Sequence, residues 1–144
     1  EINLDQQFDL ITAWHVLEHT LDPVIFLQQA VARLRPGGIL AIQVPSFDYL
    51  DEFRKRQQFS NLVCAVHNFY FTVTNLRMLL EKFGVHIVQL ANDPEALLLT
   101  AIVVKPLTMA DRLSKARRLI QSGEWHTLVQ EIHSYWRWKL TNPV

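Results

Sequence analysis

The stretch "FDLITAWHVLEHTLDPVIFLQQAVARLRPGGILAIQVP", residues 8–45, decides the fold of this chain. It opens with a short apolar run over 8–14 that contains a β-branched pair, which is typical of a buried parallel strand. Thr20 or Asp22 can cap a helix that begins with the following proline, and apolar residues then recur at helical spacing until "RPGG" stops the helix. The apolar run over 39–45 predicts a second strand. A strand, a helix and a strand joined this closely form a βαβ unit with a right-handed crossover.

The rest of the chain continues the α/β pattern. Helical spacing and caps alternate with short apolar runs, and "ANDPE" has the composition of a hairpin turn. Residues 47–59 could form a helix with a charged outer face. The clearer signals predict, in chain order, a helix over 72–84 capped by Thr72 or Thr74, strands over 85–90 and 96–104, and helices over about 108–121 and 124–140.

Length and composition fit one folded domain. The chain has 144 residues, of which 49% are hydrophobic, so a sizeable core is expected and a disordered chain is not. The single cysteine, Cys64, permits no disulfide within the chain, which predicts a reducing, cytoplasmic compartment and a small buried side chain at this position. No apolar run approaches the roughly 20 residues that cross a bilayer, so no membrane span is expected.

Charge is unevenly distributed along the chain. Residues 1–104 contain 7 Lys and Arg against 11 Asp and Glu, a balance of −4, and residues 105–144 contain 7 against 3, a balance of +4. The basic residues of the second part form no dense run. A solvated helix face therefore explains them better than binding to nucleic acid.

Three motifs follow one another in this chain: "FDLITAWHVLEHTLDP" (8–23), "LRPGGIL" (34–40) and "HNFYFTVTNLRMLLEKFGV" (67–85). Together they resemble the second half of class I S-adenosylmethionine-dependent methyltransferases, and the resemblance covers about residues 5–105. It implies an α/β fold made of half a Rossmann-like methyltransferase sheet, strands four to seven with the last pair antiparallel. A C-terminal helical hairpin, outside the resemblance, would follow.

The chain departs from that family in its glycines. The family holds its cofactor with a glycine-rich loop after strand one and an acidic residue after strand two, whereas this sequence has four glycines and no G-x-G. The resemblance implies S-adenosylmethionine as the cofactor of a parent enzyme. It also implies that the N-terminal half of the domain is a missing partner, that this chain supplies one wall of the site, and that the fragment alone is inactive.

Residues 15–19 spell H-x-x-E-H, which on a long helix is the motif of a zinc peptidase. Here a strand-like run ends just before His15 and a new helix starts just after His19, which argues against a peptidase. Two other interpretations stay open. In the first, which we favour, the strand end shapes a pocket without metal, and the resemblance implies that Ala13, Trp14 and His15 line the cofactor at the methyl-transfer centre.

In the second interpretation, these residues hold a divalent ion. Some O-methyltransferases of the resembled superfamily, including small-RNA 2′-O-methyltransferases, carry E-x-x-E-H at this place and use it to bind a metal. That resemblance implies His15, Glu18, His19 and His67 as ligands, with His15 in place of the first glutamate. Three imidazoles and one carboxylate favour a softer ion such as zinc or iron over magnesium.

Methyl transfer itself needs an acceptor atom held in line with the sulfonium methyl group. An acceptor hydroxyl would also need a general base, and the catalytic candidates are His19 and His67 because histidine titrates near neutrality. His67 could equally be a loop histidine that binds nearby backbone. The expected acceptor is a small-molecule, sugar or lipid-like compound.

The residues after Pro106 predict a separate element. We expect the half-methyltransferase domain over 1–106 and a helical extension over 107–144, which could pack on the sheet, bind another copy of the chain or contact a further domain. An exposed edge on the first strand also predicts a homo-oligomer. A competing interpretation is a degenerate, non-catalytic module for interaction or oligomerisation. One apolar face of the last helix would carry Trp125, Leu128, Ile132, Tyr135 and Trp136.

Overall fold

The computed structural model describes residues 6–141, apart from the side chains of residues 135, 136 and 138–141. The chain divides into two compact units, residues 1–106 and 107–144, and each is described by itself. Among the described residues, no helix combines the length and the apolar character that crossing a bilayer requires.

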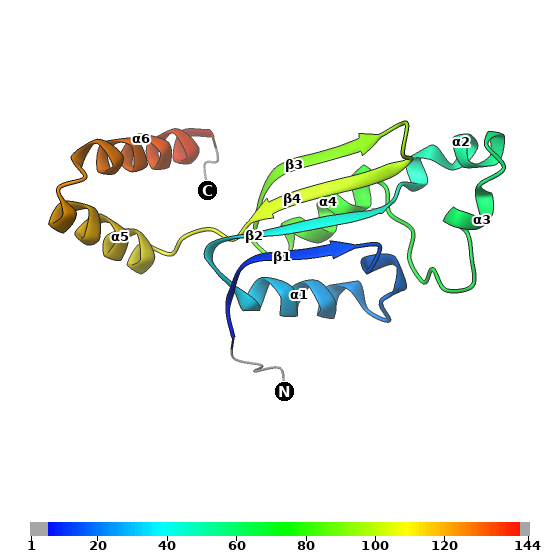
Figure 1. Cartoon of the computed structure of the whole chain (residues 1–144), viewed down its shortest axis with the longest axis horizontal. Coiled ribbons are helices and arrows are strands. Elements are labelled where there is room, and N and C mark those ends of the chain that lie inside the picture. Colours follow the sequence, from blue (N-terminus) through cyan, green and yellow to red (C-terminus); the bar gives the residue numbers. More distant parts are fainter. Residues whose placement is uncertain (1–5, 142–144) are drawn as a thin grey trace. The chain divides into compact units, whose positions relative to one another are not determined.

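The first unit is built on a mixed four-stranded sheet (Figure 1). Its strands are β1 (Phe8–Trp14), β2 (Leu34–Pro45), β3 (His86–Asp93) and β4 (Leu98–Val104), in the spatial order β1-β2-β4-β3. β1 pairs with β2 in parallel, and β4 runs antiparallel to both β2 and β3. The predicted α/β sheet with an antiparallel last pair is therefore confirmed.

Two helices of this unit pack on one face of the sheet, α1 (Pro23–Arg33) and α4 (Val73–Glu81) (Figure 1). The Asp22 side chain caps α1 by accepting from the backbone N–H groups of its first turn, and Thr72 forms a capping box with Asn75 at α4. The sheet and both helices share one core, whose fully buried side chains include Leu27, Leu40, Ile42, Leu76, Leu80, Leu99 and Val103.

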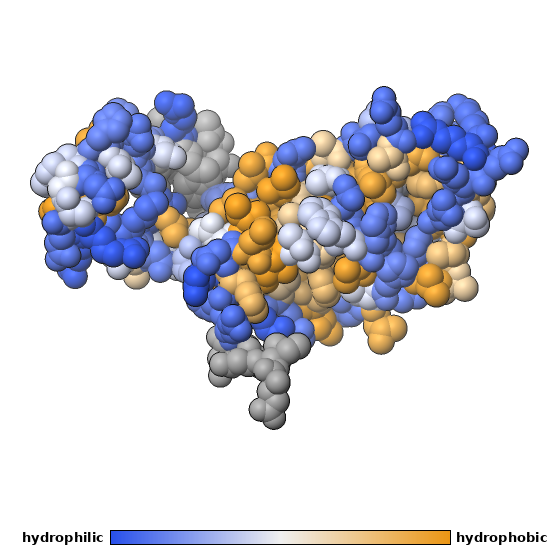
Figure 2. Space-filling model, viewed as in Figure 1, coloured by the Kyte–Doolittle hydropathy of each residue, from blue (hydrophilic) through white to orange (hydrophobic). Residues whose placement is uncertain are grey.

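Within the described residues of the first unit, no helix covers the other face of the sheet or the β1 edge. Leu10 is 57% exposed and Trp14 is 49% exposed, although both belong to the strand that begins the parallel pair. Figure 2 shows apolar side chains gathered over the strands on the face turned to the viewer. This arrangement leaves apolar surface and a row of strand hydrogen-bonding groups without cover.

The predicted start of the second strand is wrong. β2 begins at Leu34 and not at residue 39, because the "RPGG" segment continues as strand. Gly37 has a φ of 82° and its N–H donates to the Lys105 carbonyl at 2.8 Å, while the Lys105 N–H donates to the Gly38 carbonyl at 2.9 Å. The glycines thus permit a sharp bend that stays paired.

The predicted helix over 47–59 is also wrong, because it is broken into short turns. The segment forms η2 (Phe47–Tyr49) and α2 (Leu50–Lys55), and α3 (Phe59–Leu62) follows. Gln57 has a φ of 57°, a left-handed conformation that ends the helix. These turns pack around a second small core formed by Phe53, Leu62 and Leu97.

The second unit is the predicted helical hairpin, formed by α5 (Met109–Ser122) and α6 (Trp125–Thr141). Thr108 caps α5, and Gly123 ends it with a φ of 76°. Lys115 on α5 pairs with Glu131 on α6 at 2.7 Å. Of the predicted apolar face, the side chains of Tyr135 and Trp136 lie outside the described residues.

Candidate functional site

The candidate site begins where β1 ends. The His15 N–H still donates to the Gln43 carbonyl at 2.9 Å, but its φ of 52° turns the chain out of the sheet. A 3₁₀ turn, η1 (Leu17–His19), follows and directs Leu17 and Glu18 inward. The strand end and the turn therefore place a carboxylate beneath two histidines.

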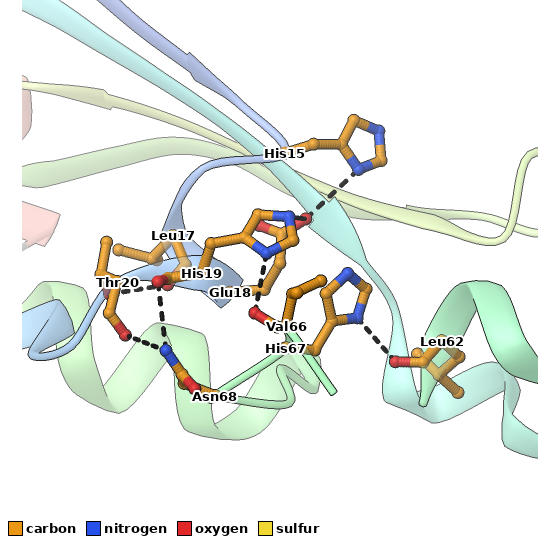
Figure 3. Close-up of polar contacts among 9 residues, drawn as sticks. All are labelled: His15, Leu17, Glu18, His19, Thr20, Leu62, Val66, His67 and Asn68. Carbon is orange, nitrogen blue, oxygen red and sulfur yellow. Dashed lines mark hydrogen bonds and ion pairs between the residues drawn. The ribbon is translucent and has the colours of Figure 1, made fainter. Parts of the chain in front are cut away.

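Glu18 is buried, with 2% of its side chain exposed, and neither of its carboxylate oxygens has a hydrogen-bond partner among the described residues. His15 Nδ1 lies 3.3 Å from Glu18 Oε1, and His19 Nε2 lies 3.9 Å from the same oxygen (Figure 3). Burying a carboxylate without hydrogen bonds is costly. Such a group in a folded protein calls for an explanation.

A second loop brings His67 to the same place (Figure 3). The rings of His19 and His67 meet edge to face with centroids 4.7 Å apart. His19 Nδ1 lies 2.9 Å from the Val66 carbonyl oxygen, and His67 Nδ1 lies 2.7 Å from that of Leu62. A carbonyl only accepts, so each Nδ1 carries the proton and donates it. In the neutral ring each Nε2 therefore keeps its lone pair.

Backbone hydrogen bonds hold the two loops together. The N–H groups of Asn68 and Phe69 both donate to the Glu18 carbonyl, at 2.8 and 3.2 Å. The Asn68 side-chain amide donates to the carbonyls of His19 and Thr20, each at 3.2 Å. The loop geometry is thus fixed by main-chain contacts, and the Glu18 carboxylate takes no part in it.

The donor set fits a divalent ion. One oxygen of Glu18 and one nitrogen each of His19 and His67 lie within 4.8 Å of one another. Each histidine is oriented through a hydrogen bond from its other ring nitrogen, which is the usual second support of a metal-binding imidazole. Two imidazoles and a carboxylate suit zinc and similar borderline ions.

A cavity of about 520 Å³ opens beside these residues, at the carboxyl ends of β1 and β2. Apolar side chains form part of its wall. The remaining lining residues are His15, Gln58, Ser60, Asn61, Cys64 and His67. Its volume lies within the range of ligand pockets, roughly 300–1,000 Å³.

The structure separates the predicted cofactor-binding residues. The Ala13 side chain is in the core, Trp14 is half exposed, and only His15 lines the cavity. Of the four predicted metal ligands, Glu18, His19 and His67 are brought together, and His15 reaches only Glu18. Cys64 is half-buried and lines the cavity, so the prediction of a buried cysteine is wrong.

Sequence reasoning missed Asn68 and the polar cavity residues on the α2–α3 segment. Asn68 directly follows His67, and this position next to a candidate ligand could have pointed to it. For Gln58, Ser60 and Asn61 the sequence offers no such signal, because polar residues at the end of an amphipathic segment read as solvent-facing.

Comparison with known proteins identifies the family. A family model described as "Methyltransferase domain" matches residues 1–90. A search of the curated proteins found no match.

Solved structures of methyltransferases share the fold. A chain of the Haloferax volcanii complex between the Trm112 methyltransferase activator and a methyltransferase matches with a TM-score of 0.56 at 14% identity, over 71% of this chain and 56% of that one. A Methanosarcina mazei SAM-dependent methyltransferase matches with a TM-score of 0.53 at 20% identity, over 72% and 62%. Human N-acetylserotonin methyltransferase, solved with SAM, matches with a TM-score of 0.53 at 22% identity, over 68% and 29%. The chain thus spans little more than half of the Haloferax chain, and at these identities the likeness is one of fold.

Proposed function

The chain belongs to the methyltransferase-domain family, and from that premise we propose that it forms the acceptor-side part of an S-adenosylmethionine-dependent methyltransferase. The observation that carries the proposal is the buried Glu18 carboxylate, which lacks hydrogen bonds and faces His19 and His67 at a cavity beside the strand ends. Ligands of open α/β sheets bind at this end of the strands. The cavity and the carboxylate–imidazole group therefore belong to one site.

In this proposal the protein's own residues position the acceptor and receive its proton. S-adenosylmethionine, when bound, supplies the methyl group for an in-line substitution. The Nε2 atoms of His19 and His67 can accept a proton from an acceptor hydroxyl, because each Nδ1 is held as a donor by a carbonyl. Glu18, buried beside them, stabilises the imidazolium that forms.

The site needs a second wall, which we assign to the N-terminal half of the same domain. The chain covers 56% of the Haloferax methyltransferase-complex chain, and the β1 edge is exposed. A groove of about 350 Å³ runs between β1 and α1 and is lined by Phe8, Leu10 and Phe26 among others. A further strand and its helix would cover this edge. Without that cover, the exposed β1 edge favours pairing with a second copy of the chain.

A divalent ion at Glu18, His19 and His67 is a second candidate, favoured by one specific observation. The three donor atoms converge, and the carboxylate accepts no hydrogen bond among the described residues. An ion bound there would polarise an acceptor oxygen and favour its deprotonation. The two candidates differ in whether transfer depends on added metal.

The competing proposal is a non-catalytic module. It predicts that the chain binds partners through its apolar surface and has no affinity for S-adenosylmethionine. An upstream coding segment for the glycine-rich half would favour the enzyme.

The test is calorimetric titration with S-adenosylmethionine, first of the 144-residue chain and then of the chain mixed with a separately expressed N-terminal half. The experiment is repeated with EDTA and with Zn²⁺. Methyl transfer from radiolabelled S-adenosylmethionine by the two halves together, lost in His19→Gln with His67→Gln, would support the enzyme. Failure of the two halves together to bind S-adenosylmethionine would refute it.

A further inference from the structure

The cavity beside His15 is polar but carries no formal charge. Among the described residues that line it there is no Asp, Glu, Lys or Arg. Its polar groups are two amides, one hydroxyl, one thiol and two imidazoles, with apolar side chains between them. The wall therefore offers hydrogen bonds in several directions and no permanently charged side chain.

The cations nearest in sequence are engaged elsewhere. Arg54 lies over the ring of Phe59, with its guanidinium carbon 5.5 Å from the ring centroid. Lys55 pairs with Glu52 at 2.6 Å. Arg56 donates to the carbonyls of Glu95 and Pro94, at 2.7 and 3.0 Å. None of the three is thereby directed to the cavity, and Arg56 instead ties the α2–α3 segment to the β3–β4 turn on the opposite wall.

Backbone strain gathers around the same cavity. Within residues 6–141, three non-glycine residues have a left-handed φ: His15 at 52°, Gln57 at 57° and Leu97 at 59°. His15 lines the cavity, Gln57 precedes the lining residue Gln58, and Leu97 stands between two lining residues. A left-handed φ is unfavourable for a non-glycine residue, and such residues concentrate at functional sites. All three segments that carry a left-handed residue thus border the same cavity.

We propose that this cavity binds the methyl acceptor and selects an uncharged acceptor rich in hydroxyl or amide groups, such as a sugar ring. The inference rests on the proposed function for the identity of the ligand as a methyl acceptor. It follows from the lining: a carboxylated or phosphorylated ligand would lose its hydration without gaining a cationic partner. A neutral ring with several hydroxyls would instead find donors and acceptors on Gln58, Ser60 and Asn61.

Two pyranose sugars of similar size test the selection. Methyl α-D-glucopyranoside is neutral and D-glucuronate is anionic. Each is titrated into the ¹⁵N-labelled 144-residue chain, and the backbone amides of Asn61, Cys64 and Ala96 are followed. We expect the neutral ring to shift these amides and glucuronate to bind at least about tenfold more weakly.

A charge variant makes the test specific. Asn61→Lys adds a cation to the cavity wall and should allow glucuronate to bind at least about tenfold more tightly than in the parent chain. Gln28→Lys adds the same charge on the exposed surface of α1 and should leave the preference unchanged.

The outcomes test the acceptor class separately from the proposed methyltransferase function. Glucuronate binding as tightly as the neutral ring in the parent chain would overturn the inference, and so would an absence of shifts at the cavity with every ring. Binding of S-adenosylmethionine by the reconstituted halves is measured independently. If that binding holds while the rings fail, only the acceptor class is wrong.

Discussion

Replacing Glu18 by glutamine should stabilise the metal-free protein. Glutamine has nearly the shape of glutamate but no charge. Glu18 is 2% exposed, and its two oxygens lack hydrogen bonds, so the folded state carries a dehydrated charge that the unfolded state hydrates. The nearby imidazoles compensate little, because His15 and His19 are 49% and 39% exposed and their attraction is screened by solvent.

The expected gain is about 1–3 kcal/mol, because a buried charge without hydrogen bonds costs more than the neutral amide that replaces it. For a unit of 106 residues this corresponds to roughly 4–8 °C of melting temperature for each kcal/mol. Denaturant unfolding in EDTA measures the free energy directly. Glu52→Gln is the matched control: Glu52 is partly exposed, with 39% of its side chain accessible, and it pairs with Lys55 across the helix surface, so its replacement should change stability by less than about 0.5 kcal/mol.

Zinc should reverse the order of the two proteins. At a zinc concentration about a thousandfold above its Kd, binding stabilises the parent chain by about 4.1 kcal/mol, while the glutamine variant lacks the anionic ligand and gains little. If Glu18→Gln instead destabilised the protein in EDTA by more than about 1 kcal/mol, the carboxylate would be a structural group. The interpretation of Glu18 as a functional residue would then fail.

Four further changes test the fold and the site. Gly38→Ala should destabilise the first unit by about 1–3 kcal/mol in denaturant unfolding, because a Cβ there would lie 2.8 Å from a backbone carbonyl oxygen that cannot move aside. Asp22→Ala should cost about 1 kcal/mol in the same assay, since two N–H groups at the start of α1 lose their acceptor. His67→Gln should weaken zinc binding by at least about tenfold in calorimetry, whereas His126→Gln on the hairpin should not change it. Leu10→Lys should reduce self-association through the β1 edge in analytical ultracentrifugation, and a parent chain that is monomeric at high concentration would contradict that assignment.

The sheet could be predicted because its signals are local. Each strand of the first unit is a short apolar run, and Asp22 with Pro23 marks the start of α1 before any tertiary contact is considered. The same reasoning failed for the "RPGG" segment. Proline and glycine normally end an element, yet here Gly37 and Gly38 exchange hydrogen bonds with Lys105, about 70 residues later. Only the tertiary pairing makes that segment a strand.

The candidate site, too, could be predicted from the sequence only in part. His15, Glu18 and His19 could be singled out together because they are neighbours in sequence, and His67 could be added only by resemblance to a family. The convergence of His67 with His19 depends on hydrogen bonds between loops 47 residues apart, as from His19 to the Val66 carbonyl. The spacing of apolar residues along the sequence does not predict such a contact. The wall that the α2–α3 segment adds to the predicted pocket was missed for a related reason, since it depends on where Gln57 breaks the helix.

The hydrogen bonding around Glu18 separates structure from function. The hydrogen bonds that Asn68 and Phe69 donate to the other loop end on the backbone carbonyls of Glu18, His19 and Thr20, and the His19 ring donates to the Val66 carbonyl. None of these bonds uses the Glu18 carboxylate. An apolar side chain at position 18 would leave all of these bonds intact and would remove a buried charge. The fold therefore gives no reason for a carboxylate there, whereas the two imidazoles that converge with it, of which His67 also lines the cavity, do. A residue that the local fold does not require, held where its burial is costly, is best explained by the chemistry of the site.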